Sequence, residues 1–154
     1  MIRVQREDFD IGAEIEALTG GNDQIGAVAS FVGITRADAG EDAGDAVSAM
    51  TLEHYPAMTE KQLSDIEAEA CRRWELTASL IVHRYGRLEP GDRIVLVVTA
   101  AAHRRAALDA CAFLIDWLKT KAPFWKREET ADGDRWVAAR AADDRAAERW
   151  HSGS

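Results

Sequence analysis

The stretch RIVLVVTAAAHRRAALDACAFLIDWLKTKAPFWKREE, residues 93–129, predicts a strand, a long helix and a second strand in direct succession. Residues 93–101 are almost all apolar, which is typical of a strand covered on both faces. A helix is predicted from about residue 103 to 121, because an apolar stripe recurs there at helical spacing: Ala107, Cys111, Leu114 and Leu118. Pro123 disfavours helical geometry at Ala122, so the helix should end at that point.

Upstream of this stretch, three further strands are predicted at residues 26–33, 47–55 and 76–86. The Gly-, Asp- and Ala-rich segment 34–46 should form a mobile loop with Arg36 at its root. Pro90 and Gly91 predict a turn at 89–92.

Two upstream helices are predicted from their start signals. Asp10 can cap a short helix that Gly20 and Gly21 end, with an apolar face of Ile11, Ile15 and Leu18. Thr59 and Gln62 form a capping box for the next helix, with Met58 and Leu63 placed for a hydrophobic staple. The core-facing side of that helix consists of Leu63, Ile66, Ala70 and Trp74.

Downstream, FWKREE and DRWVAA flank TADG and predict a hairpin, followed by a short polar helix at about 141–150 and a tail to residue 154. No internal repeat or linker divides the chain, so residues 1–154 are expected to form a single domain. The mixed order of elements favours an α+β fold over a doubly wound sheet.

Composition excludes several classes of function. The chain has 154 residues and a formal charge of −8, which argues against general affinity for nucleic acid or anionic membrane. It contains no 18-residue apolar run, and residues 1–7 lack the apolar region of a signal peptide. Cys71 and Cys111 stand alone, which fits a reducing cytoplasm and argues against a zinc site or a disulfide framework. The sequence has no P-loop, dinucleotide-binding fingerprint or metal-ligand spacing, so no cofactor and no metal are expected.

Against this acidic background, cations gather at the start of the long helix. His103, Arg104 and Arg105 follow an apolar strand and open the helix, where unpaired amides and the helix dipole favour anions. These residues therefore form a candidate phosphate site. The alternative is that they are solvated residues of the first turn.

Lys119 lies at the other end of the same helix, roughly 24 Å from His103 at 1.5 Å per residue. One small ligand cannot contact both side chains if the helix is straight. The site is then elongated, or two copies of the chain meet, or the helix breaks before Lys119. A plainer interpretation is that Lys119 and Lys121 interact with the helix dipole.

The hairpin adds two cations that should lie on opposite faces of a strand. Lys126 shares a face with Phe124 and Glu128, while Arg127 shares the other face with Trp125 and Glu129. A lysine beside apolar side chains has a lowered pKa and can act as a nucleophile or base. Alternatively, Glu128 or a neighbouring glutamate simply pairs with it.

The remaining reactive residue types are assigned structural roles. His54 and His83 lie in predicted strands and are interpreted as core or edge histidines whose hydrogen bonds are satisfied. Cys71 and Cys111 lie on helix faces and are interpreted as small buried hydrophobic residues.

Four separated motifs, TLEHYPAMTEKQL, GDRIVLVVTAAAHR, LKTKAPFWKRE and DGDRWVAA, resemble those of the large, catalytic subunits of molybdopterin synthase. The resemblance covers about residues 26 to 150. It implies an α/β-hammerhead fold with a mixed sheet, packed helices and a C-terminal hairpin. It also implies a homodimer that binds two small ubiquitin-like sulfur carriers, giving a heterotetramer.

The activity implied by the resemblance is sulfur transfer. The carrier ends in Gly-Gly with a terminal thiocarboxylate, and two such sulfurs convert cyclic pyranopterin monophosphate to molybdopterin. The alternative from another class is a non-catalytic module that binds a small phosphorylated ligand with the same cations. The imported sulfur would explain why neither cysteine has the setting of a nucleophile.

The resemblance also implies roles for particular residues. Lys119 and Lys126 are the expected catalytic residues, and the expected substrate-binding set is Arg36, His103, Arg104, Lys119, Lys126, Arg127 and Glu128. One position departs from the family, because Ile34 stands where many members have a lysine. A substrate contact by that side chain is therefore not expected here.

Overall fold

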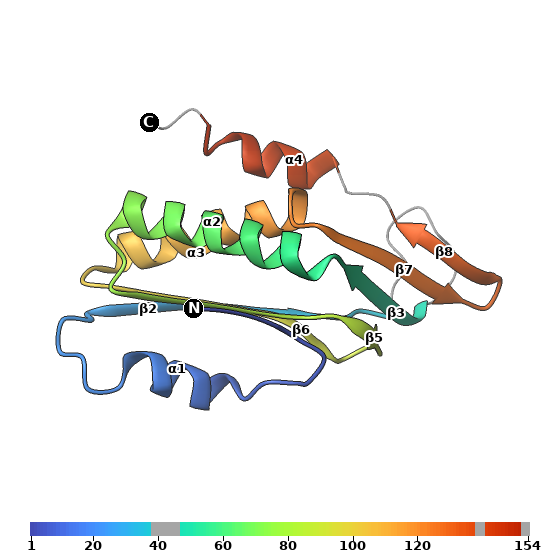
Figure 1. The fold of residues 1–154 in the computed structure, drawn as a ribbon, viewed down its shortest axis with the longest axis horizontal. Helices are drawn as coiled ribbons and strands as arrows, with labels where there is room; N and C mark the ends of the chain where they lie inside the picture. Colours follow the sequence, from blue (N-terminus) through green and yellow to red (C-terminus); the bar gives the residue numbers. More distant parts are fainter. Residues whose placement is uncertain (38–46, 138–140, 152–154) are drawn as a thin grey trace.

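The computed structural model describes residues 1–37, 47–137 and 141–151. They form an α+β fold, as predicted, built on two four-stranded sheets (Figure 1). The first sheet has the order β1 (Ile2–Gln5), β4 (Ala78–Arg84), β6 (Arg93–Ala101) and β2 (Ala27–Ile34). The second has the order β5 (Gly86–Leu88), β3 (Val47–His54), β7 (Phe124–Thr130) and β8 (Gly133–Val137).

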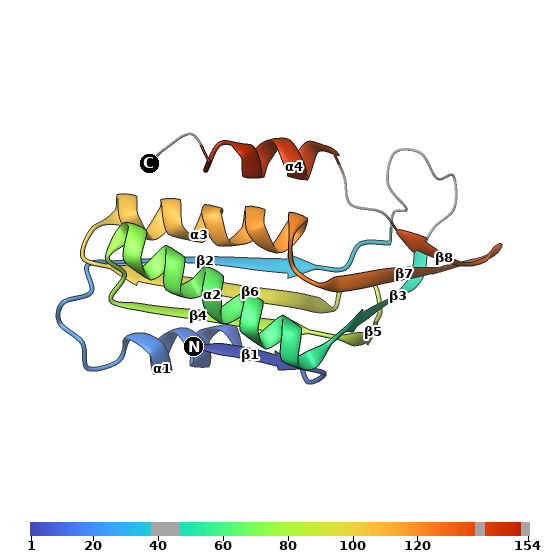
Figure 2. The same cartoon turned by 45° about the horizontal axis from the view of Figure 1, so that its top comes forward.

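Helices cover both faces of the first sheet (Figures 1 and 2). Helix α1 (Ile11–Thr19) lies on one face, and α2 (Pro56–Trp74) and α3 (Arg104–Thr120) lie side by side on the other. Helix α4 (Ala141–Glu148) packs over α3. Within the described residues, no helix is both long and apolar enough to cross a lipid bilayer.

Strand β6 supplies the core on both of its faces, because alternate side chains point in opposite directions. Val95, Val97 and Ala101 pack with the buried faces of α2 and α3. Leu96 and Val98 pack with α1 and with Phe9. The nearly continuous apolar run from 93 to 101 follows from this coverage.

Most predicted elements are confirmed. Asp10 caps α1 by accepting a hydrogen bond from Ala13 N at 2.9 Å. The 89–92 turn forms, with Gly91 at φ 93°, a conformation that favours glycine. The hairpin and the C-terminal helix also form. The greater part of the predicted 34–46 loop lies outside the described residues.

The predicted capping box at Thr59 is wrong. Helix α2 begins at Pro56, whose fixed φ suits the first helical position and whose missing N–H would have no helical partner there. Thr59 therefore lies within the first turn and not at the cap. It is fully buried there, and its hydroxyl donates to Tyr55 O at 2.9 Å. It contributes to the core rather than to a cap.

Strands β1 and β5 were not predicted. Both are very short, and each is stabilised by pairing rather than by its own pattern: β1 pairs with β4, and β5 pairs with β3. β5 follows β4 after a break at Tyr85, so the predicted strand 76–86 divides between the two sheets. This division carries the chain from the helix-covered sheet into the second sheet.

Candidate active site at the C-terminal end of helix α3

Helix α3 carries candidate residues at both of its ends. It runs unbroken from Arg104 to Thr120, so the alternative in which it breaks before Lys119 is wrong. At about 1.5 Å per residue, His103 and Lys119 are separated by roughly 24 Å. A compact site within one chain therefore cannot contain both side chains.

At its C-terminal end, α3 leads into β7 beside a buried histidine of β4. His83 is 8% exposed, and its ring stacks on Phe124 with centroids 3.8 Å apart and planes 14° from parallel. Burial lowers the pKa of His83 to about 4, and the charge of Lys119 contributes in the same direction. His83 is therefore neutral at neutral pH and lies within the electrostatic reach of Lys119.

Two histidines in this region have defined tautomers. His83 Nδ1 lies 2.8 Å from Arg84 O, and a carbonyl only accepts, so Nδ1 carries the proton. His54 Nδ1 lies 3.1 Å from Thr59 Oγ1, which already donates its hydrogen to Tyr55 O. His54 therefore also carries its proton on Nδ1. In the neutral form, both rings are left with Nε2 as an acceptor.

Further rings extend this cluster. The His54 ring lies 4.6 Å from that of Tyr85 and 5.6 Å from that of Phe124. The Arg6 guanidinium lies 4.7 Å from the Tyr85 ring centroid, a cation–π distance. Burial lowers the pKa of His54 as well. The polar atoms of the cluster are thus set in a largely aromatic wall.

Lys126 lies two residues beyond Phe124 on the same face of β7, as predicted. Its Nζ is 3.3 Å from Glu128 Oε1, and Arg135 donates to Glu128 Oε2 at 3.2 Å. Glu128 is only 7% exposed, so this buried carboxylate is balanced by a cation at each oxygen. The carboxylate thereby holds the Lys126 ammonium in place, and the pairing left open by the sequence is observed.

Phe124 connects the surroundings of the two lysines. Lys119 acts on His83, which stacks on Phe124. Lys126 follows Phe124 by two residues, about 7 Å along the strand. The end of α3 and the start of β7 therefore bring Lys119 and Lys126 into one region of the molecule.

Arg127 does not join them. It lies on the opposite face of β7, where it pairs with Trp136 in the register and its Nε is 3.8 Å from Asp134 Oδ2. The face of β7 that carries Arg127 also carries Trp125, which packs edge-on against Tyr55. A direct contact of Arg127 with a ligand held by Lys126 is not favoured by this geometry.

The N-terminal end of α3 is open. His103 occupies the N-cap position without a side-chain capping bond, and both His103 and Arg104 are exposed. Arg105 is paired with Asp109 along the helix, with 3.2 Å between Nε and Oδ2. Within the described part of the chain, Arg104 is the first-turn arginine that forms no ion pair, and its exposed side chain is placed for an anion.

Arg36 is also exposed, just beyond β2. Its neighbour Thr35 is tied to the 89–92 turn by two backbone bonds, from Thr35 N to Asp92 O at 2.9 Å and from Gly91 N to Thr35 O at 2.8 Å. The backbone next to Arg36 is therefore anchored to this turn. Ile34 is 53% exposed at the end of β2.

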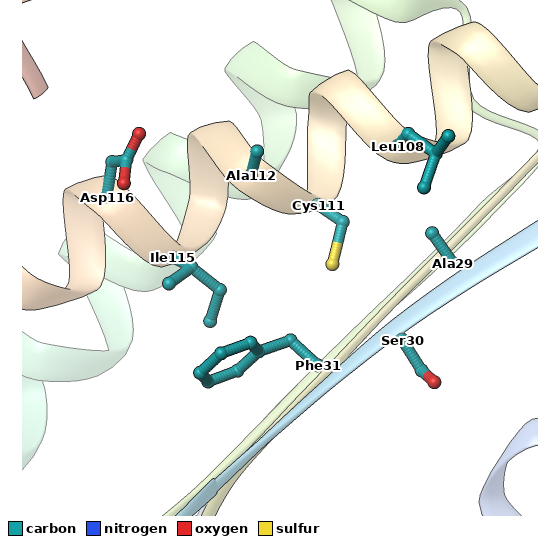
Figure 3. A pocket seen from close by; sticks show the side chains of 8 residues that line it. All are labelled: Ala29, Ser30, Phe31, Leu108, Cys111, Ala112, Ile115 and Asp116. Carbon is teal, nitrogen blue, oxygen red and sulfur yellow. The ribbon is translucent and has the colours of Figure 1, made fainter. Parts of the chain in front are cut away.

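A cavity of about 380 Å³ lies between the edge strand β2 and α3 (Figure 3). Phe31, Cys111 and Ile115 point into the gap between the two elements. Leu108 belongs to the same lining and is 58% exposed. Positions 108, 112, 115 and 119 share one face of the helix, so the cavity and Lys119 lie along the same row.

The family described as MoaE protein matches residues 4–121. The chain belongs to this family. A molybdopterin synthase catalytic subunit from Ralstonia nicotianae is 56% identical over 149 residues, covering 97% of this chain and 83% of the relative. The MoaE motifs recognised in the sequence therefore reflect similarity over nearly the whole chain.

Solved MoaE structures share the fold. The molybdopterin biosynthesis MoaE protein from Burkholderia ambifaria has a TM-score of 0.82 at 54% identity, covering 98% of this chain and 97% of that one. A chain from the complex of subunits 1 and 2 of molybdopterin-converting factor from Helicobacter pylori has a TM-score of 0.73 at 19% identity, covering 90% and 91%.

In this MoaE chain, the cysteines have structural settings. Burial raises the pKa of the Cys111 thiol to about 11, so the thiol is protonated at neutral pH. Cys71 is partly buried, with Sγ 3.5 Å from Ser79 Oγ. Among the described residues, no group of three or more His, Cys, Asp or Glu side chains has a metal-binding arrangement.

Sequence reasoning underrated one part of the site. His83 was interpreted as a core histidine, which its burial confirms, but its position beside Lys119 was not predicted. Phe124 was treated only as a neighbour of Lys126. The available signal was a histidine at an inward position of an otherwise apolar strand, which requires a partner for each ring nitrogen.

Proposed function

We propose that this chain is the catalytic subunit of a molybdopterin synthase. It transfers two sulfurs from the thiocarboxylate ends of small carriers to cyclic pyranopterin monophosphate, forming molybdopterin. The observation that carries this proposal is the convergence of Lys119 and Lys126 near Phe124 in a chain 56% identical to a named catalytic subunit of that enzyme. We expect the reaction to take place in the cytoplasm.

Lys119 and Lys126 are the catalytic residues of this proposal. The carrier's terminal thiocarboxylate is an anion, and negative charge develops on its acyl oxygen as water attacks the acyl carbon and the bond from that carbon to the transferred sulfur breaks. Two ammonium groups held beside an aromatic wall stabilise that charge better than water does, because they need no reorganisation. Lys126 is already held by Glu128, at 3.3 Å, so Glu128 acts through Lys126 rather than on the substrate.

His103, Arg104 and Arg36 bind the substrate phosphate. His103 and Arg104 place cationic donors at the helix start, where the first-turn amides also favour an anion. Arg36 projects from an anchored backbone at the end of β2. Arg127 lies on the far face of the hairpin and is therefore less well placed to bind the phosphate.

Two copies of the chain complete one site. The edge strand β2, the cavity beside α3 and the exposed Leu108 form an apolar face that a second copy can cover. A two-fold axis perpendicular to α3 at this face would run the two α3 helices in opposite directions. The His103 and Arg104 end of one helix then lies beside the Lys119 end of the other, which resolves their separation of roughly 24 Å.

A small ubiquitin-like carrier is the second partner, one for each copy. The Helicobacter pylori structure is a complex of two subunits of molybdopterin-converting factor, which supports an assembly of two kinds of chain. A Gly-Gly tail suits a narrow approach to the lysines because it has no side chains. Attraction between its charged end and the lysines implies that carrier binding weakens as salt rises.

The deciding experiment supplies the chain with a thiocarboxylated carrier and cyclic pyranopterin monophosphate and measures the dithiolene product. Product formation with two carriers consumed per pterin is expected. Tight pterin binding without any product would contradict the proposal and would favour the non-catalytic phosphate-binding module instead. A carrier ending in an ordinary carboxylate is the matched control, since it can dock but has no sulfur to transfer.

A further inference from the structure

We propose that His83 is a positioning residue for Lys119: the stacked imidazole offers Nε2 to the Lys119 ammonium and holds it at the reacting centre. The catalytic part of this inference rests on the proposed function. The structural part, a coupling between His83 and Lys119, does not.

The first step is the tautomer. His83 donates Nδ1–H to Arg84 O across 2.8 Å, which leaves Nε2 without a proton in the neutral ring. A buried acceptor without a partner is costly, so a nearby ammonium is the natural group to meet it. Since Nδ1 is bonded to the main chain, the direction in which Nε2 points is set by the backbone of β4.

The second step is the rigidity of the ring. Phe124 stacks on it at 3.8 Å, and the register neighbours on either side are Val4 of β1 and Val95 of β6. The ring therefore has an apolar neighbour on each of these three elements. A ring held in this way fixes the position of whatever its free nitrogen binds.

The third step is the identity of the group it faces. His83 lies two residues beyond Ile81 on β4, and Ile81 packs with the buried faces of α2 and α3, so the His83 side chain lies on the same face of the sheet as the helix that carries Lys119. Lys119 of α3 and His54 of β3 are the two side chains whose charge acts on His83 there. His54 has its own hydrogen-bond partner in Thr59, at 3.1 Å. Lys119 is thus the cation that approaches His83, and the neutral imidazole accepts from it without adding a competing positive charge to the anion site.

The direct test uses NMR of the folded chain with its lysines carrying ¹³C-methyl groups. The chain has four lysines, Lys61, Lys119, Lys121 and Lys126, so each signal can be assigned by a Lys→Arg variant. In His83→Phe, which keeps the ring but removes the acceptor, the pKa of Lys119 should fall by roughly half a unit or more. The Lys61 and Lys121 signals should titrate as before.

Two further variants make the test specific. His83→Asn keeps a donor for Arg84 O but does not reach the Nε2 position, so it should lower the pKa of Lys119 as His83→Phe does. His83→Gln places an amide oxygen near that position and should restore most of the wild-type value. His54→Phe is the matched control from the same ring cluster and should leave the Lys119 titration unchanged.

The catalytic readout is separate. His83→Phe should lower kcat for sulfur transfer about 10- to 100-fold with little change in KM, and His83→Gln should recover most of it. An unchanged Lys119 titration in both His83→Phe and His83→Asn would overturn the inference. If the wild-type chain makes no dithiolene but the His83 variants still shift the Lys119 titration, the coupling is supported and only the proposed function is refuted.

Discussion

The two ends of helix α3 carry cations in opposite settings. At the C-terminal end, Lys119 lies within reach of a buried neutral histidine, and Lys126 is held 3.3 Å from a carboxylate that is itself 7% exposed. At the N-terminal end, His103 and Arg104 are exposed, and His103 makes no capping bond through its side chain. The cations at the C-terminal end are held in position by contacts within one chain. The cations at the N-terminal end are exposed and need a partner or ligand to complete their contacts.

This difference separates chemistry from binding. Groups that stabilise a transition state must be held before the reaction, because reorganisation during the reaction costs part of the stabilisation. Groups that bind a phosphate can remain solvated until the ligand arrives. The supported end of α3 is therefore the expected reaction centre, and the open end is the expected phosphate site of a neighbouring copy.

The largest effect should come from the supported end. Lys119→Ala should lower the rate of sulfur transfer at least about 100-fold, because it removes a charge at the reacting centre. Lys121→Ala is the matched control, since Lys121 is exposed at the end of the same helix and should change the rate less than about twofold. Steady-state assays of dithiolene formation measure both, and near-normal turnover by folded Lys119→Ala would refute the assignment.

A smaller effect, chiefly on KM, is expected at the open end. Arg104→Ala should raise KM for the pterin about tenfold with little change in kcat, the loss expected for one charged hydrogen bond. Arg105→Ala is the control, because Arg105 already pairs with Asp109. An unchanged KM together with weaker carrier binding would exclude the phosphate role.

Mixed dimers sharpen the comparison between the ends. If each site combines Lys119 of one copy with Arg104 of the other, a dimer of Lys119→Ala and Arg104→Ala chains contains one intact site. Mixing the two inactive or weakened variants should then restore activity at low pterin concentration. No restoration, or light scattering that shows an active monomer, would mean that each chain builds its site alone.

Lowering the pH should destabilise the folded chain through His83, at the C-terminal end of α3. Its pKa is about 4 in the folded chain against 6.5 when unfolded, so between these values only the unfolded chain gains the proton. The free energy of unfolding should thus fall as pH drops from about 6.5 to 4, by up to about 3 kcal/mol from this residue. Urea unfolding at several pH values checks this, and His83→Phe should flatten the dependence. A slope identical to wild type would contradict it.

The smallest effect is expected from the cysteines. A double Cys71→Ala and Cys111→Ala variant should retain sulfur transfer within about twofold and lose about 1 kcal/mol or more of stability from the smaller side chains. Intact Cys111 should react slowly with a thiol reagent in the native state, since burial raises its pKa to about 11. Loss of transfer in the folded double variant would mean that sulfur passes through the protein.

Much of this architecture was predictable from local pattern. The strand at 93–101, the Asp10 cap and the end of α3 before Pro123 follow from apolar runs, caps and proline, whose effects act over a few residues. The start of α2 was mispredicted because Thr59 fits a capping pattern but is buried by its tertiary contacts. Strands β1 and β5 were missed because partners elsewhere in the chain stabilise them.

For the site, the sequence by itself determined which side chains carry charge: Lys119, Lys126, His103 and Arg104, with the two helix ends necessarily far apart because an α-helix has a fixed rise per residue. Only the tertiary structure decided which of these charges is held in place. His83 meets Phe124 because β4 and β7 lie beside the same end of α3, and Glu128 holds Lys126 because β8 brings Arg135 to its other oxygen. Such contacts join segments distant in sequence, so their energy depends on packing and burial that no local pattern records.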